Sequence, residues 1–406
     1  MTASVTVSQT PIPPAIGRDL RLDFFRGLAL VFIFIDHIPD NLIANFTIRN
    51  IGFSDATEMF VFISGYTAGL VYMAAMLREG WLFASARILR RVWQLYMAHI
   101  ALFVVFTAQI AWTAAHFDNP GYAEEMNVVA FLKEPHVAIV QALLLSFKPV
   151  NLDVLPLYVV LLAALPIMLI LLAQSQALIL TLSFALYAAA NLLQWNLPGY
   201  PPGSEWFFDP FAWQLLFVLG VVLGSRVSTG KSLLLESRFG RWLRHPAVLT
   251  AAIVYLVTAM VITVIWQWLD DDDDMLPQWL VNFLFPISKT YLSPWRFMHF
   301  LAMAYVAMRW FRRDHPFFAS RWARPFLLIG ESGLQMFCLS VFLSFAGHFV
   351  LVEFDADVWM QLAVNAVGIG IMLSVAALIN WYKITERGRG AVQKRRPVVK
   401  AEGMAE

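Results

Sequence analysis

The chain has little charge and almost no cysteine. Asp, Glu, Lys and Arg make up only 14% of its 406 residues, whereas 59% are hydrophobic, with a net charge of +1. This composition excludes an ordinary soluble domain, gives no indication of nucleic-acid binding, and is typical of a protein that crosses a membrane several times. The single cysteine, Cys338, cannot form an internal disulfide, so cysteine usage does not indicate a redox compartment.

Two further features are missing. Residues 1–17 contain neither the apolar core nor the cleavage site of a signal peptide, so we expect a disordered cytoplasmic tail there. The histidines and acidic residues show no metal-ligand spacing, so we predict no metal site. The membrane domain is expected at residues 18–382, followed by a basic cytoplasmic tail at 383–406.

Long apolar segments dominate what is present. A membrane-spanning helix needs about 20 mostly apolar residues. Ten segments satisfy this requirement: 20–38, 57–77, 92–114, 153–172, 177–193, 210–225, 247–268, 291–309, 326–351 and 358–382. The sequence therefore predicts an all-α polytopic membrane protein with about ten transmembrane helices. Two shorter apolar segments, 136–147 and 277–287, are predicted to be re-entrant or interfacial.

The basic residues indicate an orientation in the membrane. Most of the 29 Lys and Arg residues fall in alternate loops and in the C-terminal tail. Basic residues concentrate on the cytoplasmic side, so both termini are predicted to be cytoplasmic. Only Arg49, Lys133, Lys148, Lys289 and Arg296 fall on the outer side in this topology.

Arg26 and His37 are the most informative residues of the first predicted helix. They lie eleven residues apart, which is about three helical turns, or about 16 Å, so both side chains point the same way. Polar side chains inside a membrane helix are costly and usually face a cavity or a partner. We therefore expect the two residues to mark opposite ends of one buried site.

At the outer end of this helix, acidic residues accompany His37. Pro39 disfavours helix at Ile38, so the helix is expected to end at about His37. Asp55 and Glu58 share a face at the start of the second helix. A carboxylate that orients a histidine builds a general base. Glu58 is the better partner for His37, because Asp36 points about 100° away on the helix; a merely polar, solvated helix end is the alternative.

At the inner end, arginines precede the third predicted helix. These are Arg87, Arg90 and Arg91, on the side to which Arg26 also points. Clustered guanidinium groups suit bidentate phosphate recognition, although cytoplasmic topology alone also accounts for a basic loop. Coenzyme A carries phosphates at one end and a thioester at the tip of a long arm, so an acyl-CoA fits the span from Arg26 to His37. His37 would then deprotonate the attacking hydroxyl.

The second predicted helix contains Gly65 and Gly69, a spacing that permits close helix packing. Acyl transfer also needs a group that polarises the thioester carbonyl. Ser64, Tyr66 or a backbone group are candidates, and the sequence does not decide among them.

Several stretches carry a resemblance to a known family. They are DFFRGLALVFIFIDHIP, FVFISGYTAG, NLDVLPLYVVL, FAWQLLFVLG, KTYLSPWRFMHFLA and GESGLQMF, in this order within residues 18–382. The chain resembles the type 3 membrane acyltransferases and, more narrowly, their OpgC branch, which succinylates osmoregulated periplasmic glucans in Gram-negative bacteria. The resemblance implies an inner-membrane enzyme that uses cytoplasmic acyl-CoA, in particular succinyl-CoA, as donor and a periplasmic glucan as acceptor, with no permanently bound cofactor. It carries over His37 as the catalytic residue and Arg26, Arg87 and Arg90 as donor-side residues.

A succinyl group carries a free carboxylate, which a cation on the outer side would recognise. Lys289, Arg296 and His299 lie close together in the sequence and are the candidates, with Asp55 on the same substrate side. The alternative is that Arg296 pairs with an outer acid and that Lys289 is merely interfacial.

Two other functions remain open: a transporter or exporter of a saccharide or anionic molecule, and a membrane scaffold without chemistry. The sequence does not indicate an oligomeric state.

Overall fold

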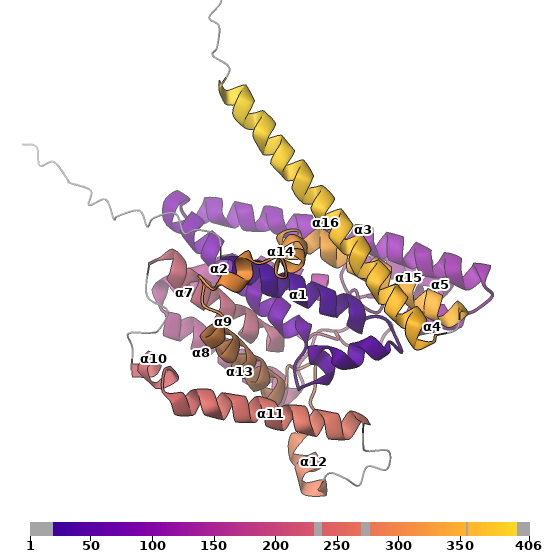
Figure 1. Cartoon of the computed structure of the whole chain (residues 1–406), viewed down its shortest axis with the longest axis horizontal. Coiled ribbons are helices and arrows are strands. Elements are labelled where there is room, and N and C mark those ends of the chain that lie inside the picture. Colours follow the sequence, from indigo (N-terminus) through magenta and orange to yellow (C-terminus); the bar gives the residue numbers. More distant parts are fainter. Residues whose placement is uncertain (1–18, 231–237, 269–276, 355, 396–406) are drawn as a thin grey trace, which may run out of the picture.

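The computed structural model describes residues 19–230, 238–268, 277–354 and 356–395, and it is helical throughout (Figure 1). Within these residues, β-pairing is limited to one isolated bridge between Pro198 and Glu205. The predicted N-terminal tail, residues 1–17, lies outside the described part of the chain. The last helix continues to Arg395, beyond the predicted start of the C-terminal tail at residue 383.

The long helices correspond to the apolar segments of the sequence. They are α1 (Leu20–Asp36), α2 (Ala56–Glu79), α3 (Trp81–His116), α7 (Val154–Gln174), α8 (Gln176–Leu193), α9 (Pro210–Ser228), α11 (Pro246–Trp268), α13 (Pro294–Trp310), α15 (Gly333–Glu353) and α16 (Val358–Arg395). Short elements connect them: η1 (Leu42–Phe46), η2 (Ile48–Asn50), α4 (Gly121–Glu125), α5 (Val129–Lys133), α6 (Pro135–Leu143), α10 (Arg238–Leu243), α12 (Gln278–Leu284), η3 (Pro316–Ala319) and α14 (Arg324–Glu331).

All ten predicted segments are helical, but not all have the length of a membrane span. Eight helices of the described residues are long and apolar enough to cross a membrane, whereas α1 and α13 have only 17 residues each. The predicted segment 326–351 is divided at Ser332 into α14 and α15. The segments 136–147 and 277–287 contain the short helices α6 and α12. The chain is therefore a multi-pass helical membrane protein, with eight spans supported rather than ten.

Helix α1 lies at the centre of the bundle, against α2, α14 and α15 (Figure 1). It begins after Asp19, whose side chain accepts a hydrogen bond of 3.1 Å from the backbone N–H of Arg21. It ends at Asp36, and His37 follows as its C-cap, as Pro39 predicts. Close contact with α14 is possible because both helices have a glycine at the crossing: a Cβ on Gly27 would lie 1.9 Å from the carbonyl oxygen of Phe326.

Helices α2 and α9 make the most intimate pair in the bundle. A Cβ on Gly65 would lie 2.2 Å from the carbonyl oxygen of Phe217, and one on Gly69 would lie 2.1 Å from that of Val221. Gly220 and Gly224 of α9 approach the backbone of α2 in the same way. The packing role predicted for Gly65 and Gly69 is confirmed, because small residues let two helix backbones approach closely.

Gly69→Ala is expected to destabilise the protein, because the added methyl group would force α2 and α9 apart. Overpacking of this kind costs about 1–3 kcal/mol in the free energy of unfolding. Gly370→Ala is the matched control, since a Cβ there meets nothing within 4 Å. Thermal unfolding in lipid nanodiscs, followed by tryptophan fluorescence, should show a lower midpoint for Gly69→Ala only; equal midpoints would contradict the packing account.

Candidate functional site

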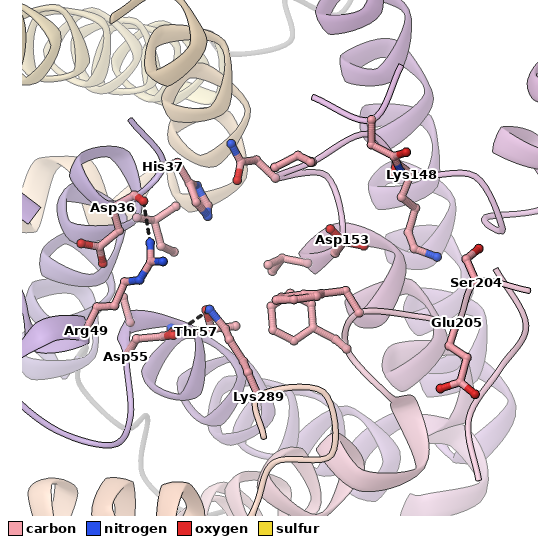
Figure 2. A pocket seen from close by; sticks show the side chains of 18 of the residues that line it. Asp36, His37, Arg49, Asp55, Thr57, Lys148, Asp153, Ser204, Glu205 and Lys289 are labelled. Carbon is pink, nitrogen blue, oxygen red and sulfur yellow. Dashed lines mark hydrogen bonds and ion pairs between the residues drawn. The ribbon is translucent and has the colours of Figure 1, made fainter. Parts of the chain in front are cut away.

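A cavity of about 700 Å³ opens beside the C-terminal end of α1, and we call it the His37 cavity (Figure 2). Its walls come from segments far apart in the chain: the end of α1, η2, the start of α2, the loop before α7, the loop before α9 and the loop before α13. The charged or titratable lining residues are Asp36, His37, Arg49, Asp55, Lys148, Asp153, Tyr200, Glu205, Lys289 and Arg296.

The ring of His37 points into this cavity (Figure 2). The backbone N–H of His37 donates to the carbonyl oxygen of Ile33 at 3.1 Å, which fixes the residue at the helix end. Its ring atom Nδ1 is buried and has no hydrogen-bond partner among the described residues. A buried polar atom without a partner calls for an explanation, such as a ligand or water that it meets. The Nδ1 of His37 is therefore available to a molecule in the cavity.

Neither predicted acidic partner contacts His37. The Asp36 carboxylate accepts a hydrogen bond of 2.6 Å from the hydroxyl of Thr47. Glu58 accepts one of 2.9 Å from the backbone N–H of Asp55 and is fully buried beside Arg296. Both carboxylates are thus engaged elsewhere, and the expectation that Glu58 or Asp36 orients the imidazole is not met.

Four charged residues form a compact cluster in the wall of the cavity. Asp55 contacts Lys289 at 2.6 Å and Arg296 at 3.0 Å, and the Nε of Arg296 donates to Glu58 at 2.8 Å. Burial raises the pKa of Asp55, but Lys289 and Arg296 outweigh that effect and hold the pKa well below its usual range. A buried charge requires such partners, because its desolvation is expensive.

This cluster changes the assignment of the succinate-binding candidates. Lys289 and Arg296 are already paired with carboxylates. The structure thus agrees with the alternative in which Arg296 pairs with an acidic residue on the outer side. His299 is buried, its Nδ1 lies 2.7 Å from the hydroxyl of Ser54, and it does not line the His37 cavity. Asp55 is at the cavity but acts as the hub of the cluster.

Two other cations line the same cavity, and the sequence analysis did not select them. Arg49 donates from Nη1 to the carbonyl oxygen of Asp36 at 2.8 Å. Lys148 donates to the carbonyl oxygen of Leu145 at 3.1 Å and lies 3.9 Å from the centre of the Trp206 ring. Burial lowers the pKa of Lys148 to about 8, against the effect of nearby Asp153. Neither cation forms an ion pair with a carboxylate of the described residues. Because only five basic residues fall on the predicted outer side, the presence of Arg49 and Lys148 there could have identified them as candidates.

A second cavity, of about 360 Å³, lies near the N-terminal end of α1, and we call it the Arg26 cavity. Its cationic lining residues are Arg26, Arg91 and Lys383. The Nη2 of Arg26 donates to the hydroxyl of Thr67 at 2.9 Å, and Lys383 donates to the hydroxyl of Ser332 at 3.1 Å. Lys383 was not among the predicted donor-side residues, because it falls in the predicted basic tail.

Most of the remaining candidates lie outside this second cavity. Arg87 pairs with Glu79 at 2.9 Å, and neither Arg87 nor the exposed Arg90 lines the cavity. Ser64 lines the Arg26 cavity, whereas Tyr66 lines a separate apolar cavity of about 230 Å³ between α1, α2 and α13. Neither lies in the His37 cavity, where the thioester carbonyl would have to be polarised.

Residues that line the two main cavities are close together on α2 and on α7. Thr57 of α2 lines the His37 cavity and Phe60 lines the Arg26 cavity; these residues are about 4.5 Å apart along the helix axis. On α7, the consecutive residues Val154 and Leu155 line one cavity each. Phe60 and Phe337 both line the Arg26 cavity, with ring centres 6.0 Å apart. The two cavities are therefore separate but have neighbouring lining residues on α2 and α7.

The fold and its two cavities define a polytopic helical membrane protein with a polar site at each end of its central helix. The model of the OpgC protein family matches residues 18–384, and the chain belongs to this family. Membership points to a membrane acyltransferase that acts on glucans. No curated protein and no solved structure matches the chain.

Asp55→Asn is expected to destabilise the protein, because it leaves Lys289 and Arg296 beside Glu58 alone. Breaking a buried ion pair from one side costs about 3–5 kcal/mol. Asp314→Asn is the control, since Asp314 and Arg312 form an exposed pair at 3.5 Å. Thermal midpoints of purified protein in nanodiscs should fall for Asp55→Asn and stay unchanged for the control; an unchanged midpoint for both would refute the structural role of the cluster.

Proposed function

We propose that the chain is an O-acyltransferase that moves an acyl group, in particular succinyl, from a cytoplasmic coenzyme A thioester to a hydroxyl group of a periplasmic glucan. The observation that carries the proposal is the pair of polar cavities along α1, one lined by Arg26 and the other by His37. A donor with a long thin arm can keep its phosphates in one cavity and present its thioester in the other.

The Arg26 cavity suits the donor. Arg26, Arg91 and Lys383 line it and would meet the phosphates of coenzyme A, since guanidinium groups bind phosphate in a bidentate manner. Arg87 and Arg90, which the family resemblance also assigns to the donor side, lie on the same helix as Arg91 and would contact parts of the donor outside the cavity. The basic loops favour the cytoplasm for this end of α1.

The His37 cavity suits the acceptor. Its lining combines polar side chains with the aromatic rings of Tyr200, Phe207 and Phe208, a mixture typical of ligand sites. A glucan hydroxyl beside the His37 ring would be activated there.

The reaction would proceed by general base catalysis. A ring nitrogen of neutral His37 accepts the proton of the hydroxyl group while the oxygen attacks the thioester carbonyl carbon. The tetrahedral intermediate collapses, the carbon–sulfur bond breaks, and the coenzyme A thiolate takes the proton from the imidazolium. The products are an acyl ester on the glucan and free coenzyme A.

His37→Ala is expected to abolish ester formation on the glucan, because it removes the imidazole that takes the hydroxyl proton in this mechanism. His116→Ala, which removes an exposed histidine stacked on Trp112, is the control. Release of free thiol from succinyl-CoA, measured with purified protein and glucan, reports the reaction. Wild-type protein that releases no thiol would favour the transporter alternative, and full activity of His37→Ala would exclude this mechanism.

Arg26→Gln is expected to weaken donor binding, because it removes a cation from the phosphate-binding cavity. Loss of a charge-assisted hydrogen bond corresponds to about a tenfold or larger rise in KM for succinyl-CoA. The KM for the glucan should change little. Arg78→Gln, at an exposed basic position outside the cavity, is the control. A rise in the KM for the glucan alone would instead place Arg26 on the acceptor side.

A further inference from the structure

The cations of the His37 cavity fall into two groups. Lys289 and Arg296 pair with Asp55, so their charges are compensated within the protein. Arg49 and Lys148 line the same cavity, and among the described residues their side chains donate to carbonyl oxygens and form no ion pair, although the Asp36 and Asp153 carboxylates are near enough to act on them electrostatically. A cation without a carboxylate partner in a ligand cavity is available to an anionic ligand. One of these two residues is therefore placed to bind a carboxylate.

Geometry selects Arg49. The two carbonyl carbons of a succinyl group are joined by three C–C bonds of about 1.5 Å each, so its carboxylate lies less than about 5 Å from the carbon under attack. The residue that reads the carboxylate must consequently be close to the catalytic base. Arg49 satisfies this requirement, because its Nη1 lies 2.8 Å from the carbonyl oxygen of Asp36, which belongs to the peptide group that joins Asp36 to His37.

Lys148 is less well placed. It comes from the loop before α7, and Figure 2 shows it across the cavity from His37, with Asp153 between them in this view. Its ammonium group is held over Trp206 at 3.9 Å and by the carbonyl oxygen of Leu145. A group at that wall is suited to the acceptor rather than to a short acyl chain attached at His37.

The segment that carries Arg49 is braced on both sides. The hydroxyl of Thr47 donates to the Asp36 carboxylate at 2.6 Å, and the amide of Asn50 donates to the carbonyl oxygen of Ala44 at 2.9 Å. Farther back, the amide of Asn41 donates to the side-chain oxygen of Asn365 on α16 at 3.1 Å. The Thr47 contact ties the start of η2 to the end of α1, and the other two contacts brace the loop around it. The Arg49 side chain is exposed; its Nη1 bond to the carbonyl oxygen of Asp36 places the guanidinium group beside the end of α1, and its Nε and Nη2 have no hydrogen-bond partner among the described residues.

We propose that Arg49 selects the acyl group: its guanidinium, held beside His37, binds the free carboxylate of a dicarboxylic acyl chain such as succinyl. The inference rests on the proposed acyl transfer and adds a determinant of donor specificity to it. A neutral acyl group such as acetyl would make no such contact, so the enzyme would use it less well.

The test compares two donors in one protein. Purified full-length protein in nanodiscs is given succinyl-CoA or acetyl-CoA with a neutral glucan, and acyl esters are quantified by mass. Arg49→Gln is expected to lower the ratio of kcat/KM for succinyl-CoA over acetyl-CoA by about tenfold or more, as expected for one charge-assisted contact. Arg49→Lys should keep part of the preference. The acetyl-CoA rate reports intact folding, because only a folded enzyme transfers either group.

Lys148→Met is the matched comparison, because it removes the other unpaired cation of the same cavity. It should leave the donor ratio unchanged. An unchanged ratio in Arg49→Gln, or a lost preference in Lys148→Met but not in Arg49→Gln, would overturn the assignment. Should Arg49→Gln lose both activities, Arg49→Lys decides. A full or partly reduced preference of this variant for succinyl-CoA over acetyl-CoA supports a charge contact, and the absence of any preference refutes it. Wild-type protein that acylates with neither donor would refute the proposed function itself.

Discussion

One carboxylate, that of Asp55, holds together the wall of the cavity in which His37 lies. One of its oxygens accepts from the backbone N–H of Thr57 at 2.7 Å and starts α2; the other contacts Lys289 and Arg296. Glu58, one turn further on, contacts the same arginine. The beginning of α2, the loop before α13 and α13 itself are therefore joined at a single buried point. Because a buried charge is tolerated only when it is paired, removing one member affects all of them.

The cluster also determines which groups are left for chemistry. By occupying Lys289 and Arg296, it leaves Arg49 and Lys148 as the unpaired cations of the cavity within the described residues, and by occupying Glu58 it leaves His37 without a carboxylate partner. Within one cavity, some charged residues are therefore paired with each other and others are not. Close glycine contacts of α1 with α14 and of α2 with α9 brace α1 and α2, which carry lining residues of both cavities.

Hydropathy predicts much of this fold, because a lipid-facing helix needs a long apolar run whatever its neighbours. The end of α1 and the close packing at Gly65 and Gly69 also follow from local rules for proline and glycine. The break at Ser332 and the extension of α3 back to Trp81 do not follow from such rules, since the hydropathy of α14 and of the start of α3 does not mark these boundaries. The site is harder to predict. Arg296 is 238 residues from Glu58, and Arg49 lies near His37 only because the fold brings η2 to the end of α1. Sequence spacing selected Arg26 on α1 and His37 at its C-cap, which are close along the chain, but it cannot predict contacts between helices.

In the proposed reaction, donor and acceptor are used from opposite ends of α1. Sealed proteoliposomes test it most directly. With succinyl-CoA enclosed inside and glucan outside, the account predicts succinyl ester on the glucan. With both substrates outside and none inside, it predicts essentially none, whichever way the protein is inserted. Equal ester formation in the two arrangements would contradict transfer across the membrane, because it would mean that both substrates reach His37 from the same side.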